Sequence, residues 1–414
     1  MSASFRTYCL LIVSTFSLCL WGQESVPKEE KALTVAERNA LQGFNDTIDR
    51  LADDFVTVSL VVADPGPILY AAFGHAMLHL QCPAFNLDYI FTYESEGIQG
   101  NWGRFLKGDL KMGMFAVKPE DIFESYRIDG RGVKEYKMNL SPQQKQELWR
   151  VMDELVTKGS NQPYDYYNHG CAISVVHVVK KALHGTSIQY GEWPNRFDGT
   201  LRELGFRCVT QSHYLWNRFA LMTLAGSHID NQHISREKKL IVPADLAEIW
   251  QNATINGQPL LEKEPQWIVS DTLHKENPWC TPLLVCIILF ILSLCSFATY
   301  YTRKKTWHTI GILIDDGILV ISTFIGAIIT YTVVLSTLPC TAWNWLIIPF
   351  NILPALAWHW RRYWALPYAV IILIWSIVMT GEWIGGHILV EWAHILLALS
   401  FCLVLVRQHW RAKA

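Results

Sequence analysis

Five long apolar runs crowd the C-terminal third of this 414-residue chain, and they constrain its fold more than any other feature. Four of them contain no charged residue, and the last contains only Glu391. At about 1.5 Å of rise per residue, each run is long enough to cross a hydrocarbon core as a helix. A chain with such runs does not fold as a wholly water-soluble protein. The sequence therefore predicts an all-α membrane bundle of five transmembrane helices, over residues 281–300, 317–338, 341–357, 365–381 and 388–406.

The loops between these runs alternate in charge, which predicts how the bundle is threaded through the membrane. Basic residues gather at 303–305, at 361–362 and at 407–413, whereas the loops near 339–343 and 382–387 contain no Lys or Arg. The positive-inside rule places the basic loops in the cytoplasm. With five spans, the N-terminal part then lies outside the bacterial inner membrane and the C-terminus lies in the cytoplasm.

The first residues have the pattern of a secretory signal peptide. Arg6 supplies a positive charge, residues 8–20 are apolar, and a cut after Gly22 fits the pattern. A signal anchor is the alternative, but the apolar stretch is short for a membrane span. The expected organisation is a signal peptide over 1–22, a periplasmic domain over 23–276 and a membrane domain over 277–414.

The predicted periplasmic part is acidic, with 26 Lys and Arg against 33 Asp and Glu. Nucleic acid is therefore not an expected partner, because phosphate binding needs concentrated positive charge. Helices are expected at 141–158, where Ser141 is an N-cap before Pro142, and at 172–183. Apolar or alternating runs predict strands of a mostly antiparallel sheet, at 56–63, 71–80, 87–93, 113–117 and 134–140. The predicted fold class is α+β.

Cys171 stands where a cysteine nucleophile is expected, immediately before the apolar helix predicted at 172–183. The unpaired backbone N–H groups and the positive dipole end of a helix N-terminus favour a thiolate over a thiol. A purely structural role is the alternative until a base is identified. The sequence contains no CxxC pair or His-x3-His spacing that predicts a metal site, and no cofactor is expected.

His75 is the candidate base for such a nucleophile. It follows Gly74 inside an apolar strand pattern, where packing alone gives little reason for a histidine. A satisfied core histidine is the alternative interpretation. His79, His169 and His177 compete for the role, and His169 is close enough to Cys171 in sequence to face the same cleft.

Further polar residues are candidates to support a Cys/His pair. A base needs a third polar group to orient it, for which Asp88 is the first choice and Tyr93 the alternative. Asn168 and His169 are candidates for binding the substrate or an oxyanion. Each has an ordinary structural alternative: Asp88 could be a charge at the edge of a strand, and Asn168 could be a turn residue.

Several segments together resemble the Lnb-type lipoprotein N-acyltransferase family, in order and with suitable spacing. They are residues 73–75, 88–93, 104–108, 164–171, 226–230 and 339–351. The resemblance implies a periplasmic, permuted papain-like domain fused to a membrane bundle. It also implies that Cys171 accepts an acyl chain from a phospholipid, with His75 as base. The chain would then pass to the α-amine of a lipoprotein's diacylglyceryl cysteine.

The sequence departs from the family pattern beside the nucleophile. The family usually has Asn-Asn-Cys followed by an Arg three residues later, whereas residues 169–174 read His-Gly-Cys-Ala-Ile-Ser. The expected oxyanion donor and the arginine are therefore missing. Two other functions remain open: a membrane-tethered papain-like peptidase or amidase that acts on cell-wall peptides through the same pair, and a non-catalytic envelope binding protein.

Overall fold

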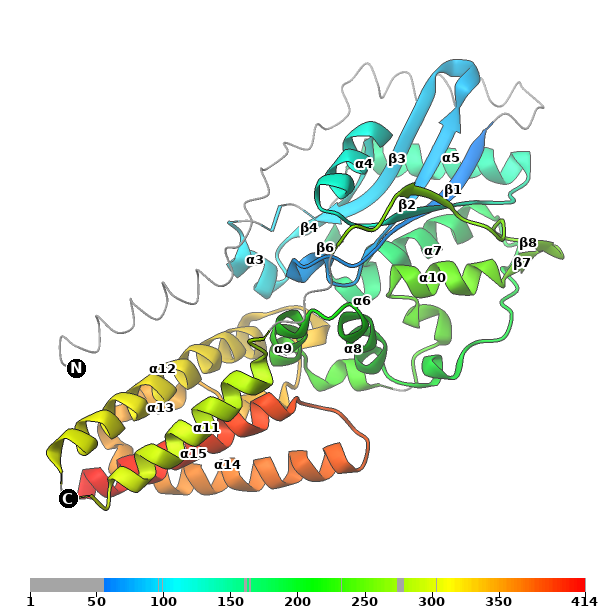
Figure 1. Cartoon of the computed structure of the whole chain (residues 1–414). Coiled ribbons are helices and arrows are strands. Elements are labelled where there is room, and N and C mark those ends of the chain that lie inside the picture. Colours follow the sequence, from blue (N-terminus) through cyan, green and yellow to red (C-terminus); the bar gives the residue numbers. More distant parts are fainter. Residues whose placement is uncertain are drawn as a thin grey trace.

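The structure, a computed structural model, describes residues 56–413 apart from 96, 99, 160, 161, 164, 232, 274–278 and 303. It has an α+β part followed by a bundle of long helices (Figure 1). The predicted signal peptide lies outside the described residues.

A seven-stranded antiparallel sheet forms the frame of the α+β part, with the strand order β6-β4-β3-β2-β1-β5-β9. The strands are β1 (Thr57–Ala63), β2 (His75–Cys82), β3 (Leu87–Ser95), β4 (Lys111–Val117), β5 (Val133–Lys137), β6 (Gln162–Pro163) and β9 (Gln266–Val269). A separate pair joins β7 (Thr254–Ile255) to β8 (Gln258–Pro259). The predicted antiparallel sheet is confirmed, although β2 begins at His75 because a 3-10 turn, η1 (Leu69–Ala71), occupies the start of the predicted strand.

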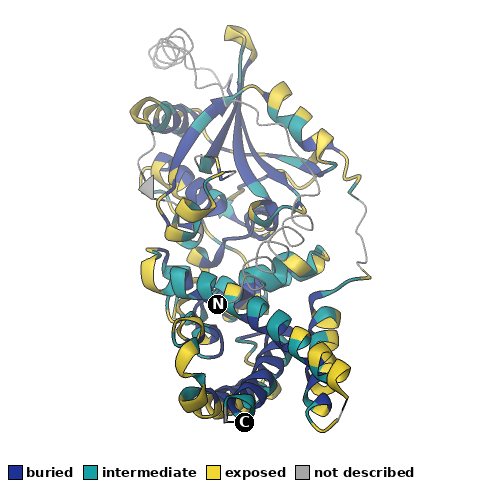
Figure 2. Ribbon diagram, turned by 90° about the vertical axis from the view of Figure 1, so that its left-hand side faces the viewer, coloured by how far each residue is buried: buried dark blue, intermediate teal, exposed yellow. Residues whose placement is uncertain are grey.

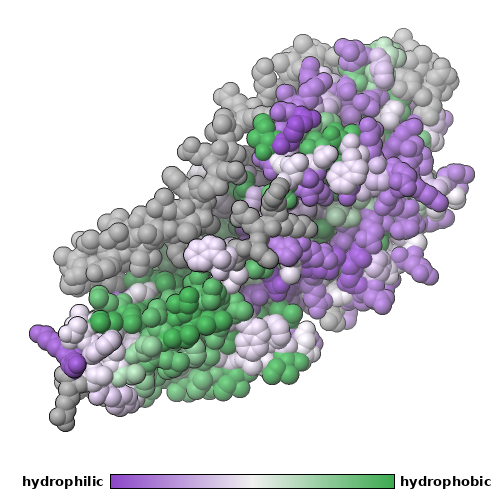
Figure 3. Space-filling model, in the orientation of Figure 1, coloured by the Kyte–Doolittle hydropathy of each residue, from purple (hydrophilic) through white to green (hydrophobic). Residues whose placement is uncertain are grey.

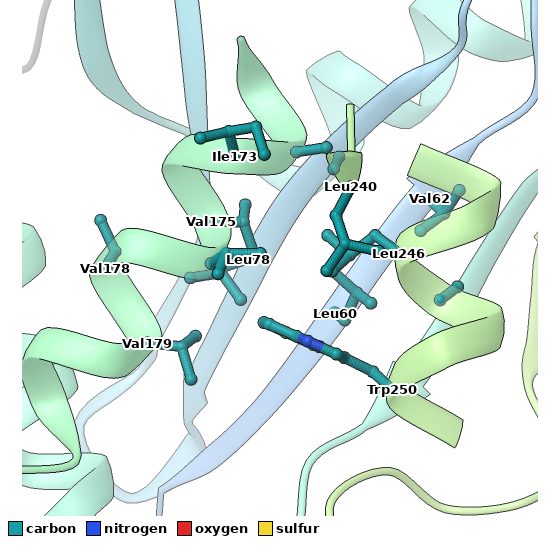
Figure 4. Close-up of a cluster of buried hydrophobic side chains, with 14 of the residues drawn as sticks. Leu60, Val62, Leu78, Ile173, Val175, Val178, Val179, Leu240, Leu246 and Trp250 are labelled. Atoms are coloured by element: carbon teal, nitrogen blue, oxygen red, sulfur yellow. The ribbon is translucent and has the colours of Figure 1, made fainter. Parts of the chain in front are cut away.

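Helices cover both faces of the sheet. The main core lies between one face and three helices, α5 (Pro142–Lys158), α7 (Cys171–Ala182) and α10 (Pro243–Gln251). Figure 4 shows this packing of strand residues such as Leu60 and Leu78 against α7 and Trp250. The other face packs against α4 (Pro119–Ile128). Ser141 caps α5 by accepting a hydrogen bond from the Gln144 N–H, as the sequence predicts.

Shorter helices and 3-10 turns complete this part and its connection to the bundle. The α-helices are α3 (Trp102–Lys107), α6 (Tyr166–His169), α8 (Leu201–Gln211) and α9 (Leu215–Leu224). The 3-10 turns are η2 (Pro83–Phe85), η3 (Asn195–Asp198), η4 (Ser227–Asp230) and η5 (Arg236–Lys239).

The bundle contains four helices that are long and apolar enough to cross a membrane, within the part of the chain that the structure describes. They are α11 (Pro282–Thr299), α12 (Lys305–Leu335), α14 (Arg361–Ile384) and α15 (Trp392–Lys413). Figure 3 shows their apolar surface beside the polar surface of the α+β part, and Figure 2 shows that many outward residues of the bundle are exposed. These exposed apolar side chains are what a lipid environment requires.

The prediction of a third membrane helix over residues 341–357 is wrong. The chain there forms short helical turns: η6 (Pro339–Thr341), η7 (Trp345–Ile347), α13 (Leu353–Leu356) and η8 (Trp358–Trp360). Pro349 and Pro354 lie in this stretch, and each lacks the N–H that a continuous helix needs. Irregular backbone at membrane depth is tolerated where protein buries it. Here the Asn351 side chain donates to the Ile347 carbonyl at 3.0 Å, and the Tyr368 hydroxyl donates to the Ile348 carbonyl at 2.7 Å.

The stretch of short helical turns from η6 to η8 still runs from one end of the bundle to the other. At its start, the Thr337 N–H donates to the Lys107 carbonyl of α3 at 2.8 Å, so it begins beside the α+β part. At its end, α14 returns 24 residues toward that part, about 36 Å at 1.5 Å per residue. Arg361 therefore lies at the opposite end, and the described residues from Pro282 to Lys413 run along the bundle five times. The C-terminus lies at the end of the bundle far from the α+β part (Figure 1).

Polar contacts fix the α+β part on the bundle through α9. Arg218 pairs with Glu391 at 2.6 Å, and the Thr223 hydroxyl lies 2.9 Å from Nε2 of His394, which stacks on Phe219. Just after α9, the Gly226 N–H donates to the Cys340 carbonyl at 2.8 Å. These contacts join segments that lie more than a hundred residues apart in the chain. They therefore fix the position of the α+β part relative to the bundle.

A buried ion pair ties the other end of the bundle together. Asp315 is 1% exposed inside α12. Its carboxylate lies 3.4 Å from Arg407 of α15 and accepts a hydrogen bond from Ser296 of α11 at 2.5 Å. Three helices therefore meet at this carboxylate, which indicates a structural role.

Candidate active site

Cys171 is the first residue of α7, and its sulfur faces the beginning of β2. Gly170 precedes it in extended backbone, after the short helix α6 that Asp165 caps. The backbone N–H groups of Ala76, Ala172 and Cys171 itself lie close enough to the sulfur to act as hydrogen-bond donors. The start of α7 and the start of β2 therefore meet at one partly exposed site.

Burial raises the pKa of the Cys171 thiol above its ordinary value, and the Glu94 carboxylate acts in the same direction. The three backbone N–H groups lower that pKa, but they offset only part of the effect. The N–H groups at the helix start act in the direction that the sequence predicts, but burial outweighs them. A base must remove the thiol proton before the sulfur can act as a nucleophile.

His75 is placed by the glycine before it. Gly74 has a φ of +85°, and a Cβ atom there would lie 2.6 Å from the Ala63 carbonyl oxygen. Only glycine fits this turn, which sets His75 as the first residue of β2. The side chains of β2 then alternate, so that Ala76 and Leu78 enter the main core while His75 and Met77 point to the α4 face.

Two residues of β3 orient the His75 ring. Its Nε2 lies 2.7 Å from Oγ1 of Thr92, and that hydroxyl donates to Oε1 of Glu94 at 2.9 Å. Because the Thr92 proton is directed at Glu94, the ring must donate its own hydrogen from Nε2 to Thr92. This assignment leaves Nδ1 of His75 without a proton, as a base requires.

The His75 ring is neutral at physiological pH. Burial lowers the pKa of His75 to about 3, and the positive charge of Arg131 acts in the same direction. No hydrogen bond joins the ring to the Cys171 sulfur in the described part of the chain. The sulfur instead faces the N–H of Ala76, the next residue along β2. The start of α7 thus brings Cys171 to the end of β2 at which the His75 side chain points to the α4 face.

Asp88 lies elsewhere on the sheet. Its carboxylate is 2.6 Å from Nε2 of His79, whose Nδ1 lies 2.8 Å from Glu135. In the register of β2 and β3, Asp88 stands opposite Gln81, far down the strand from His75. The structure thus brings Thr92 and Glu94 to His75 in place of the predicted Asp88, and assigns Asp88 to a second polar cluster.

The other predicted candidates lie around the site without joining it directly. Tyr93 points into the main core, opposite to its neighbour Thr92. The Asn168 amide donates to the Asp165 carboxylate at 2.5 Å. His169 has a buried Nδ1 with no partner among the described residues, and its carbonyl accepts from Ser174. His177 is exposed on α7.

Two further residues line the site from the α4 side, and neither was predicted. The Tyr126 hydroxyl lies 4.0 Å from the sulfur of Met77, and its pKa is raised by burial, with Glu94 and Cys171 acting in the same direction. The guanidinium carbon of Arg131 lies 4.8 Å from the centre of the Tyr126 ring. Neither residue stands out in the sequence as a site residue, because each belongs to an ordinary amphipathic or turn segment.

The described residues contain no cluster of three or more His, Cys, Asp or Glu side chains that could hold a metal ion. All the cysteines from Cys82 to Cys402 that lie in the described part of the chain are free thiols.

Two protein-family models match the chain. The Lnb N-terminal periplasmic domain matches residues 44–199, and the Lnb transmembrane domain matches residues 274–413. The first match contains every residue of the site, and the second contains the whole bundle. Comparisons with curated proteins and with solved structures gave no match. Since both models match in chain order, the protein belongs to the Lnb family, as a multi-pass inner-membrane protein with an N-terminal periplasmic domain.

Proposed function

We propose that this protein is a lipoprotein N-acyltransferase, which moves an acyl chain from a phospholipid to the α-amine of a diacylglyceryl-cysteine lipoprotein. Cys171 is the nucleophile and His75 the base, on a permuted papain-like domain in which the histidine strand precedes the cysteine helix. One observation supports the proposal: the Cys171 sulfur at the start of α7 faces the N–H of Ala76, the residue that follows the oriented His75 on β2.

The first half-reaction loads the enzyme. Nδ1 of His75 takes the proton of the Cys171 thiol, and the sulfur attacks the ester carbonyl of the phospholipid. The carbon–oxygen bond breaks, and His75 returns the proton to the departing alkoxide, which leaves as a lysophospholipid. The acyl chain is then held as a thioester on Cys171.

The second half-reaction unloads the acyl chain. The free α-amine of the lipoprotein attacks the thioester, the carbon–sulfur bond breaks, and an amide forms. His75 takes a proton from the attacking amine and returns it to the sulfur, which restores the thiol. The backbone N–H groups of Ala76 and Ala172 can stabilise the oxyanion in both steps, in place of the side-chain amide missing at Gly170.

The membrane bundle supports acyl transfer rather than hydrolysis of a soluble peptide. Pulling an acyl chain out of the bilayer costs about 0.8 kcal/mol per exposed CH2, so the site must lie against the outer leaflet. The contacts between α9 and the bundle, such as Arg218 with Glu391, hold the periplasmic domain at one end of the spans. The positive-inside rule then places the C-terminus in the cytoplasm.

Cells that depend on this protein alone for lipoprotein N-acylation provide the test. We expect Cys171→Ala to leave lipoprotein N-termini without the third acyl chain, as measured by mass spectrometry of purified lipoproteins. Cys208→Ala is the matched control, since Cys208 is a buried thiol of α8 in the same domain, and it should keep normal acylation. Normal acylation in the Cys171→Ala cells would refute the catalytic assignment.

A further inference from the structure

The short helix α3 presents large apolar side chains at the surface of the α+β part. None of its six residues is buried in the described part of the chain, although three of them, Trp102, Phe105 and Leu106, are apolar. The Trp102 side chain is 46% exposed, and its ring meets the Phe105 ring edge-on, with 5.9 Å between the ring centres. Apolar side chains that gather at a surface in this way mark a contact with a partner or a membrane.

Three hydrogen bonds attach α3 to the end of α12 that lies nearest the α+β part (Figure 1). The Tyr331 hydroxyl donates to the Gly103 carbonyl at 3.0 Å. The N–H and the hydroxyl of Thr337 both donate to the Lys107 carbonyl, at 2.8 and 3.0 Å. Gly108 follows with a φ of +82°, and a Cβ atom there would lie 2.6 Å from Oγ1 of Thr337. The height of α3 relative to this membrane helix is therefore fixed.

The sequence of α12 gives the depth of α3 in the membrane. After Asp316, α12 contains no charged residue up to its end at Leu335. Residues 317–335 measure about 28 Å at about 1.5 Å per residue, close to the thickness of the hydrocarbon core of about 30 Å. Val334 and Leu335 are exposed, as lipid-facing side chains are. The outer boundary of the hydrocarbon core thus lies near the end of α12, at the level where α3 is attached.

The charges of α3 also fit this level. Lys107 pairs with Asp109 at 2.5 Å, and Arg104 donates to the Asp109 carbonyl at 3.2 Å, so that residues 102–109 keep one net positive charge. Tryptophan rings and basic side chains both favour the headgroup layer, where the rings lie at the edge of the hydrocarbon and the cations lie near phosphate groups.

We propose that α3 is a docking surface for the outer leaflet, with the Trp102 ring in the headgroup layer of the phospholipids. The occupant of this surface is the lipid leaflet. The inference goes beyond the reaction proposed at Cys171 and does not depend on it.

This surface lies at the same end of the sheet as the candidate active site. α3 belongs to the connection between β3 and β4, whose register pairs Glu94 with Gly113 near the end of β3. Oε1 of Glu94 lies 3.9 Å from Nε2 of His75, the first residue of β2. Docking of α3 therefore brings the outer leaflet to the strand ends that carry the His75 site.

Photocrosslinking of the full-length protein in phospholipid nanodiscs tests the proposal. The photoreactive amino acid p-benzoylphenylalanine replaces one exposed aromatic residue at a time. Trp102 is the test position. Phe324 is the lipid-facing control, because it is 48% exposed in the uncharged stretch of α12. After irradiation, intact-mass spectrometry measures the fraction of protein that carries one phospholipid.

Phe85 is the matched control in the α+β part. It is 41% exposed in η2, which follows the end of β2 opposite to His75, about 23 Å away at about 3.3 Å per residue. Figure 1 shows this hairpin of β2 and β3 pointing away from the bundle.

We expect the phospholipid adduct at position 102 to be at least about tenfold more abundant than at position 85, because the probe reacts only with groups that it contacts. Fragmentation should locate the reacted carbon in the glycerol or the first acyl carbons at position 102, and further along the chain at position 324. The same result is expected in a Cys171→Ala background, since docking needs no acyl transfer.

Three results would overturn the proposal. The first is a lipid adduct at position 324 with none at position 102. The second is an adduct at position 85 as abundant as that at position 102. The third is a crosslink from position 102 to another part of this chain or to a second protein in place of lipid. If the adduct at position 102 forms but Cys171 never carries an acyl chain, the proposed function fails and the docking surface stands.

Discussion

At the scale of single residues, one set of groups orients the His75 ring and another sets its charge. Thr92 and Glu94 fix the hydrogen of the His75 ring on Nε2, while burial and Arg131 keep the ring neutral. The Cys171 thiol is likewise protonated at rest, because burial raises its pKa. In the proposed reaction, His75 and Cys171 therefore both start neutral, and the proton is transferred during the reaction.

A change of Thr92 to Val tests this arrangement. The substitution keeps the shape of a buried strand residue but removes the acceptor of the His75 hydrogen, so the ring loses its fixed tautomer. We expect acyl-adduct formation on Cys171 to fall by at least about tenfold, with the fold retained. Asp88→Asn is the control: because Asp88 contacts His79, its adduct rate should stay close to that of the wild type. The reverse pattern would restore Asp88 as the orienting residue.

Sequence patterns could identify the nucleophile and base candidates but not the residues that orient them. Cys171 and His75 are marked by local features, namely a helix start and a glycine turn before a strand. The pairing of Thr92 with His75 depends on the register of β2 against β3, in which Met77 stands opposite Thr92. A strand register is set by the whole sheet, so a choice between Asp88 and Thr92 could not be made from the sequence.

At the scale of elements, the structure differs most from the prediction in the third apolar run of the bundle. Its apolar composition predicts a helix, but Pro349 and Pro354 break it, and side chains of neighbouring helices complete its hydrogen bonds. Hydropathy reports that a segment is apolar enough to lie in the membrane. It does not report whether the backbone there is continuous.

Asn351→Leu is the corresponding test. The Asn351 amide donates to the carbonyl of Ile347 and to the Tyr368 hydroxyl, and leucine would leave these groups unsatisfied in an apolar surrounding. We expect a loss of about 1–3 kcal/mol of stability, seen as a lower midpoint of thermal unfolding in detergent. Leu356→Val, at a lipid-facing position that is 68% exposed, should change the midpoint little. Equal midpoints for the two variants would show that the amide does not hold this segment.

At the scale of the whole molecule, the junction between the periplasmic domain and the bundle explains several of the segments that resemble the Lnb family. Residues 104–108 contact the chain just after α12, where the Thr337 hydroxyl donates to the Lys107 carbonyl. Gly226 approaches Ala342 so closely that a Cβ atom would lie 1.8 Å from its carbonyl oxygen. The functional segments of this chain are thus of two kinds, those that build the Cys171 site and those that hold it at the membrane.

The most direct measurement is the intact mass of the purified protein after incubation with phospholipid vesicles. The account predicts a mass increase of one acyl chain, located on Cys171 by peptide mapping and absent from the Cys171→Ala and His75→Ala variants. Addition of a diacylglyceryl-cysteine peptide should discharge the adduct and yield an acylated peptide. A wild-type protein that acylates the peptide without an adduct on Cys171, or a Cys171→Ala variant that still transfers the chain, would contradict it.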